Sequence, residues 1–394
     1  MSARRFTLDG SDALEAYLEE LCGNVREGVR RLIPADRLDA VLLGGGYGRG
    51  EGGVLRTPSG DRPYNDLESF VFVRGNALLA ERQFREPLHE LGERLSHGTG
   101  LDVEFKVLTL DRLRRSPTTM FYYDLVLGHR CLVGDESVLA GCDHHRDATR
   151  IPLHEATRLL MNRCSGLLFS LERLERESFG PEEADFVGRN LSKAQLAFGD
   201  VLVTSAGQYH WSCRERHERL RNLVNGATPS LLAGPDQARV GSELLEHHRE
   251  GVEFKLHPIR SALSREELGK RHRQLASLGL QLWLALEGRR LGAEFPAADA
   301  YIGWPGNKCP ETPGLRNRLV NLRAFGPGAL LQSGSGRHPR ERLLNSLPGL
   351  LWLRSRSSSI HPQVLRRLQR DLVTEATDFP GLVSAYARLW SRFN

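Results

Sequence analysis

Apolar and polar residues alternate along the chain in patterns that predict a strand-containing N-terminal part. Apolar residues recur at helical spacing over 12–32 and again over 76–96, where Pro87 is expected to kink or split the helix. Two short apolar runs, 41–43 and 70–73, have the length of buried strands. Residues 101–108 alternate, with Asp102, Glu104 and Lys106 on one face, which predicts a further strand.

From residue 152 onward the apolar spacing becomes helical. It predicts helices over roughly 152–171, 181–205, from about 214, over 240–290 and near 315–324, 339–354 and 363–377. We therefore expect an α/β (α+β) chain, with a small mixed sheet followed by a mainly helical C-terminal half. The expected organisation is an N-terminal helix (1–37) packed on a sheet domain (38–150), then a helical domain (151–290) and Arg-rich helices (291–394).

Composition narrows the class of protein without naming a function. At 394 residues the chain is long enough for two or three domains, and its net charge of +5 suits an anionic substrate. No apolar run approaches the length of a membrane span, and the first residues lack the apolar segment of a signal peptide. Six cysteines without paired spacing favour reduced thiols. These features together predict a cytoplasmic protein without membrane contact.

The stretch with the clearest chemistry lies between residues 44 and 68. Three consecutive glycines, 44–46, follow the first strand and allow a tight turn whose N–H groups can approach an anion. Asp66 and Glu68 stand two apart at the head of the next strand, so their carboxylates share a face. Carboxylate oxygens in this arrangement suit Mg²⁺. The stretch therefore predicts a phosphate site beside a metal site.

The sequence Gly45-Gly46-Tyr47-Gly48-Arg49-Gly50-Glu51, followed by Asp66-Leu67-Glu68, resembles the signature of the DNA polymerase β-like nucleotidyltransferases. It is most similar to the minimal and antibiotic-modifying members, and the resemblance covers about residues 38–115. The sequence departs from that pattern in two ways. Gly46 replaces the commoner serine, and the 19-residue spacer between Gly46 and Asp66 is longer than usual, which predicts an inserted loop.

This resemblance implies the transfer of a nucleoside monophosphate, AMP from ATP in the first instance, to an acceptor hydroxyl. Asp66 and Glu68 would hold two Mg²⁺ ions, and a third carboxylate on the 101–108 strand would complete the metal site. Both Glu104 and Asp102 fit that third position, and Glu104 is favoured because it lies deeper in the strand. Whichever carboxylate serves could also accept the proton of the acceptor hydroxyl.

The same resemblance implies residues that bind the triphosphate. Gly45 and Gly46 would offer backbone N–H groups to the phosphates, and Arg49 would assist them unless it forms a structural ion pair. The family's helical domain often supplies basic residues, for which Arg163 and Lys193 are the candidates here. ATP or another nucleoside triphosphate would be the substrate.

Three matters stay open from the sequence. The acceptor is expected to be a small molecule or a protein rather than RNA, because the eight arginines between 337 and 370 are irregularly spaced and suit solvated helix faces. The alternatives are a catalytically degenerate nucleotide-binding or regulatory protein of the same fold, and a toxin–antitoxin-like modifier of a partner protein. The sequence makes no prediction of oligomeric state.

Overall fold

The computed structural model describes residues 5–97, 99–226, 231, 237–331, 334–353 and 361–394. The chain divides into two compact units. The first unit contains residues 1–152, 206–226 and 249–259, and the second contains 153–205, 227–248 and 260–394. The sheet domain expected over 38–150 therefore gains two later segments, and the helical domain expected over 151–290 is shared between the units.

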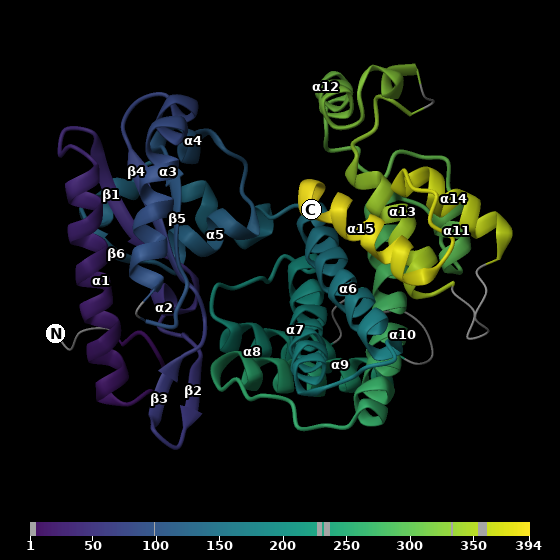
Figure 1. The fold of residues 1–394 in the computed structure, drawn as a ribbon, viewed down its shortest axis with the longest axis horizontal. Helices are drawn as coiled ribbons and strands as arrows, with labels where there is room; N and C mark the ends of the chain where they lie inside the picture. Colours follow the sequence, from purple (N-terminus) through teal and green to yellow (C-terminus); the bar gives the residue numbers. More distant parts are fainter. Residues whose placement is uncertain (1–4, 98, 227–230, 232–236, 332–333, 354–360) are drawn as a thin grey trace. The chain divides into compact units, whose positions relative to one another are not determined.

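The first unit is built on a four-stranded mixed sheet with strand order β5-β4-β1-β6 (Figure 1). Strand β1 (Leu38–Leu43) pairs antiparallel with β4 (Leu67–Val73) on one side and with β6 (Arg130–Val133) on the other. Strand β5 (Val103–Leu108) pairs parallel with β4. A parallel pair needs a crossover connection, and helix α3 (Ala77–Ser96) provides it.

Alternating side chains give each face of this sheet its own core. On one face Val41, Leu43 and Val71 pack against α3 and against α1 (Asp12–Leu32), which runs beside the sheet in Figure 1. On the other face Leu42 and Phe70 pack against α4 (Leu110–Arg115) and α5 (Met120–Leu127). The result is a sheet covered by helices on both faces.

Several smaller elements complete the first unit. The glycine turn forms the short helix α2 (Gly45–Arg49), and the expected inserted loop forms a hairpin of β2 (Val54–Thr57) and β3 (Gly60–Pro63). Helix α8 (Cys213–Asn225) belongs to the later segments, and short 3-10 turns follow β6 at Glu136–Leu139, Asp143–Arg146 and Ala148–Arg150.

The second unit is helical in the residues that the structure describes. Helices α6, α7 and α10 pack on one another, and α13 and α15 pack on α6. Tyr386 of α15 hydrogen-bonds Ser165 of α6 inside this core (2.7 Å). The helices that lie wholly in this unit are α6 (Leu153–Glu175), α7 (Pro181–Ser205), α10 (Arg265–Leu291), α11 (Ala298–Gly303), α12 (Gly314–Phe325), α13 (Arg340–Leu351), α14 (Pro362–Leu372) and α15 (Phe379–Phe393), with a 3-10 turn at Pro327–Leu331.

This architecture confirms the predicted fold class, a small mixed sheet followed by a mainly helical C-terminal half. Pro87 does not split its helix, because α3 runs through it without interruption. The sequence left one or two helices open over 240–290, and two are present, α9 (Gln237–Leu256) and α10. Among the helices described, none is long and apolar enough to cross a membrane.

Candidate active site

The glycine turn and the carboxylates meet because β1 and β4 are antiparallel. The end of β1 therefore lies beside the start of β4, with Leu43 opposite Ser69. Directly beyond this pair the Gly44 N–H donates to the Glu68 carbonyl oxygen (2.9 Å). The first residues of α2 are thus placed next to the Glu68 side chain. Their N–H groups have no acceptor within the helix, as at every helix start.

Gly45 is required at this position for two reasons. Its φ of +61° lies in the left-handed region, which residues with a side chain rarely adopt. A Cβ atom here would also stand 2.7 Å from Glu68 Oε2, so the Glu68 side chain would have to move away from the turn. A glycine therefore allows the Glu68 carboxylate to lie directly against the turn.

The parallel pairing of β4 and β5 brings a third carboxylate to the same edge. Glu68 lies in register with Glu104, and side chains in register point to the same face. Asp66 comes just before β4, two residues ahead of Glu68, and is exposed. Asp102 comes just before β5, where its carbonyl oxygen accepts the Leu67 N–H (2.8 Å). Of the two residues considered for the third carboxylate, Asp102 and Glu104, it is Glu104 that lies directly opposite Glu68.

A lysine lies between the two paired carboxylates. Lys106 Nζ is 3.2 Å from Glu68 Oε1 and 3.8 Å from Glu104 Oε2. The ammonium also lies 5.6 Å from the centre of the Phe70 ring. The sequence placed Lys106 on the face of Glu104 by alternation, but it gave no sign of the contact with Glu68. In the described part of the chain, no group of three or more His, Cys, Asp and Glu residues is arranged to hold a metal ion.

Tyr47 fixes the segment that leads into Asp66. Its side chain is fully buried, and its hydroxyl donates to the Gly53 carbonyl oxygen (3.2 Å) and accepts the N–H groups of Tyr64 (2.9 Å) and Asn65 (3.3 Å). Burial raises the pKa of Tyr47 to about 12, so the hydroxyl keeps its proton. The Asn65 side chain in turn accepts the Gly53 N–H (2.8 Å). This role of Tyr47 was not predicted from the sequence, where its position inside the glycine motif is the only signal.

Arg49 forms the structural ion pair that the sequence left open. Its guanidinium donates to Asp124 Oδ2 (2.7 Å), and the Tyr209 hydroxyl donates to the same oxygen (3.2 Å). Burial raises the pKa of Asp124, and the charge of Arg49 opposes that rise. The arginine therefore ties α2 to α5, which reduces its capacity to bind a phosphate.

Glu51, the last residue of the motif, ties the turn to α8. Its carboxylate accepts the Ser212 hydroxyl and the Cys213 N–H (2.9 Å) at the start of that helix. Lys255 of α9 lies in the same unit, and burial together with Arg49 and Arg216 lowers its pKa. Lys255 lies 204 residues after Glu51 in the chain, so no sequence pattern could associate it with the glycine motif.

We predict that Arg49→Met lowers the free energy of unfolding by about 2 kcal/mol, because it leaves the half-buried Asp124 carboxylate without its cation. The matched control is Arg31→Met, which breaks an exposed i,i+4 pair with Glu27 and should change it by under about 0.5 kcal/mol. Chemical denaturation followed by circular dichroism measures both values. Equal, small changes in the two variants would contradict a structural role for Arg49.

The two basic candidates from the helical half belong to the second unit. Arg163 lies on α6, where burial lowers its pKa and Asp200 opposes that shift. Lys193 lies on α7 with an exposed side chain. The structure thus gathers Asp66, Glu68, Glu104, Asp102, Gly45, Gly46 and Arg49 in the first unit and describes Arg163 and Lys193 with the second. A role of these two residues in binding the triphosphate stays a prediction.

Comparisons of the chain with protein-family models, with curated proteins and with solved structures find no match. The function of the chain therefore has to be inferred from the geometry of the site itself.

Proposed function

We propose that this protein is a Mg²⁺-dependent nucleotidyltransferase. The observation that carries the proposal is the register of β4 and β5, which sets Glu68 opposite Glu104 beside the glycine turn, with Asp66 at the head of β4. Strand, glycine turn, carboxylate strand and third-carboxylate strand follow one another in the order that the resemblance implies. Pairing of β1 with β4 places the glycine turn beside Glu68, and pairing of β4 with β5 places Glu104 opposite Glu68.

By residue type the carboxylates suit a hard divalent cation, although in the described residues they are not arranged as a group that holds one. Asp66, Glu68 and Glu104 offer carboxylate oxygens, the ligands that Mg²⁺ prefers. The Lys106 ammonium lies within 4 Å of both Glu68 and Glu104, so a positive charge can be accommodated between these two carboxylates. When bound, Mg²⁺ would neutralise the triphosphate and lower the pKa of the acceptor hydroxyl.

The chain's own residues would position the substrates. Gly45 and Gly46 carry no side chain between their N–H groups and a phosphate, and Tyr47 and Asn65 hold the segment that orients Asp66. Glu104 is exposed at the edge strand and would accept the proton of the acceptor hydroxyl as the new phosphate ester forms and pyrophosphate leaves. Asp102, at the start of the same strand, would be its alternative.

The substrates proposed are a nucleoside triphosphate, ATP first, and a hydroxyl of a small molecule or protein. This fold class serves many acceptors, so the acceptor has to be found by experiment. A cytoplasmic location accords with the six cysteines, all of which are free thiols, since a reducing compartment keeps thiols unpaired.

The test is an incubation of the purified protein with each α-labelled nucleoside triphosphate, Mg²⁺ and a cell extract. The Asp66→Ala/Glu68→Ala variant serves as the control. Label on a protein band or a small molecule, absent in the control, would support the proposal and identify the class of acceptor. No transfer by a folded protein, with triphosphate binding equal in the control, would count against it.

The second candidate, a catalytically degenerate nucleotide-binding protein, is favoured by one observation. Lys106 already compensates the charges of Glu68 and Glu104, so the carboxylates need no metal to coexist. Gly46 also lacks the hydroxyl that the family commonly offers to the triphosphate. In this alternative Lys106 permanently occupies the place of the metal.

Substitution of Lys106 distinguishes the nucleotidyltransferase from the degenerate nucleotide-binding protein. We predict that Lys106→Met raises the affinity for Mg²⁺ about tenfold, because a competing ammonium is removed from the carboxylates. Lys270→Met, the same substitution at an exposed lysine of the second unit, should leave the affinity unchanged. Isothermal titration calorimetry measures the three proteins. Failure of the wild type to bind Mg²⁺ while Lys106→Met binds it would favour the degenerate protein, and failure of both would count against a metal site at these carboxylates.

A further inference from the structure

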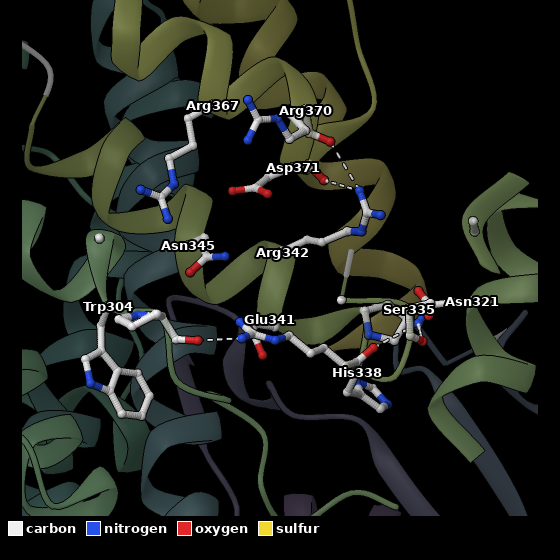
Figure 2. A pocket seen from close by; sticks show the side chains of 16 residues that line it. Trp304, Asn321, Ser335, His338, Glu341, Arg342, Asn345, Arg367, Arg370 and Asp371 are labelled. Atoms are coloured by element: carbon white, nitrogen blue, oxygen red, sulfur yellow. Dashed lines mark hydrogen bonds and ion pairs between the residues drawn. The ribbon is translucent and has the colours of Figure 1, made fainter. Parts of the chain in front are cut away.

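A cavity of about 380 Å³ in the second unit gathers arginines that the proposed chemistry does not use (Figure 2). Its walls come from α13, from α14 and from the segments at 303–305 and 334–339. Arg337, Arg342, Arg367 and Arg370 line it together with Asp371. The sequence analysis interpreted the arginines of this region as solvated helix faces. Arg370 is exposed, as that interpretation has it, whereas Arg337, Arg342 and Arg367 are only partly exposed; all four line a common cavity, while Arg354 and Arg356 lie outside the described residues.

Two of the guanidinium groups are anchored by neutral acceptors. Arg342 Nη1 donates to the carbonyl oxygens of Arg370 (3.2 Å) and Asp371 (3.3 Å), at the end of α14. Arg367 donates to the carbonyl oxygen of Ile302 in α11. Carbonyl acceptors hold a guanidinium in place without cancelling its charge. These bonds hold both guanidinium groups in place at the cavity wall.

The acids of the wall compensate only part of this charge. Glu341 is occupied by Arg337 (2.6 Å) and by the backbone N–H of Lys308 (3.1 Å). Asp371 is then the acid that faces the remaining arginines, and burial raises its pKa against their influence. Arg342, Arg367 and Arg370 against Asp371 leave an excess of two positive charges among these lining residues.

A buried lysine adds to the positive potential behind the wall. Lys308 is 1% exposed, and its ammonium donates to Oδ1 of Asn345, which lines the cavity (2.7 Å). The ammonium also lies 4.8 Å from the centre of the Tyr301 ring. Both of these partners are uncharged. Burial lowers the pKa of Lys308 to about 8, so the ammonium is still largely protonated at neutral pH.

We propose that this cavity binds a small phosphorylated molecule, with its phosphate oxygens on Arg342, Arg367 and Arg370. A guanidinium fork matches two phosphate oxygens at once, and a di-anionic or more highly charged group meets the excess charge. The volume lies within the range of small-ligand sites. Trp304, whose ring lies at the edge of the group in Figure 2, is placed to contact the organic part of the molecule. A concave site of this size suits a small ligand better than an extended nucleic acid.

The probe is inorganic pyrophosphate, titrated into the full-length protein in EDTA at fixed ionic strength. Without divalent metal, binding at the carboxylates of the first unit is not expected, so this result and the nucleotidyltransferase proposal can fail separately. The test variant is Arg370→Gln, because Arg370 is exposed and its loss should not affect folding. The matched control is Arg388→Gln, an exposed arginine of α15 in the same unit that does not line the cavity.

We expect the wild type and Arg388→Gln to bind pyrophosphate equally, and Arg370→Gln to bind it about tenfold or more weakly, as for loss of a charged hydrogen bond. The Arg367→Gln/Arg370→Gln variant should abolish binding. Absence of binding to the wild type in EDTA would overturn the proposal, as would equal binding by all variants. Binding of a single-stranded RNA, sensitive to the same substitutions while pyrophosphate fails to bind, would assign the arginines to nucleic acid instead.

Discussion

Glu68→Gln is expected to reduce nucleotidyl transfer about 10³-fold while leaving the thermal stability unchanged. The reason is that Glu68 lies against Gly45, opposite Glu104 and two residues after Asp66. It is therefore the middle one of the three carboxylates proposed to bind the metal. A metal supplies several kcal/mol of charge stabilisation, and each ~1.4 kcal/mol changes the rate tenfold. The side chain is one-third exposed, so an amide of the same size fits without disturbing the core.

The matched control for this prediction is Glu90→Gln, an exposed acid of α3 in the same unit, which should retain full activity. The measurement is the rate of label transfer at saturating Mg²⁺. Glu104→Gln and Asp102→Asn, compared in the same assay, decide the third carboxylate, and we expect the larger loss from Glu104→Gln because Glu104 is in register with Glu68. Full activity in Glu68→Gln would refute the proposed site.

Gly48→Ala is expected to lower the free energy of unfolding by about 3 kcal/mol. A Cβ atom at this position would overlap the Leu43 carbonyl oxygen and lie 2.8 Å from the Leu43 carbonyl carbon. It would also lie 3.3 Å from the Gly128 carbonyl oxygen. These are backbone atoms of a buried strand and of a helix end, so they cannot rotate away as a side chain would, and overpacking of this kind typically costs 1–3 kcal/mol.

The control substitution is at Gly23, and it is expected to raise the free energy of unfolding. Gly23 lies in the middle of α1, and a Cβ atom there would meet nothing within 4 Å. Gly23→Ala should therefore stabilise the protein by about 0.5–1 kcal/mol, because alanine loses less backbone entropy in a helix. Thermal unfolding of the two variants, measured beside the wild type, gives the signs directly. Stabilisation by both substitutions would show that α2 does not pack on β1 as described.

The local pattern of apolar and polar residues was sufficient to predict most of the helices and strands of this protein. The spacing of apolar residues predicted α1, α3, α6 and α7, because each helix buries one stripe and that stripe recurs every three to four residues. It also predicted β1, β4 and β5, and the glycine turn between the first two. The hairpin of β2 and β3 was expected only as an inserted loop, since each strand has four residues and β3 carries no β-branched or aromatic side chain to mark it as a strand.

The sequence by itself determined which residues could form a carboxylate site, because Asp66 and Glu68 lie within one motif and Glu104 lies on an alternating strand. Only the tertiary structure decided their partners. Pairing between strands set Glu104 opposite Glu68 and brought Lys106 between them, and helix packing joined Arg49 to Asp124 and gathered Arg342, Arg367 and Arg370 around one cavity. Such contacts join residues that are distant in the chain, and no local period encodes which distant residue will lie opposite.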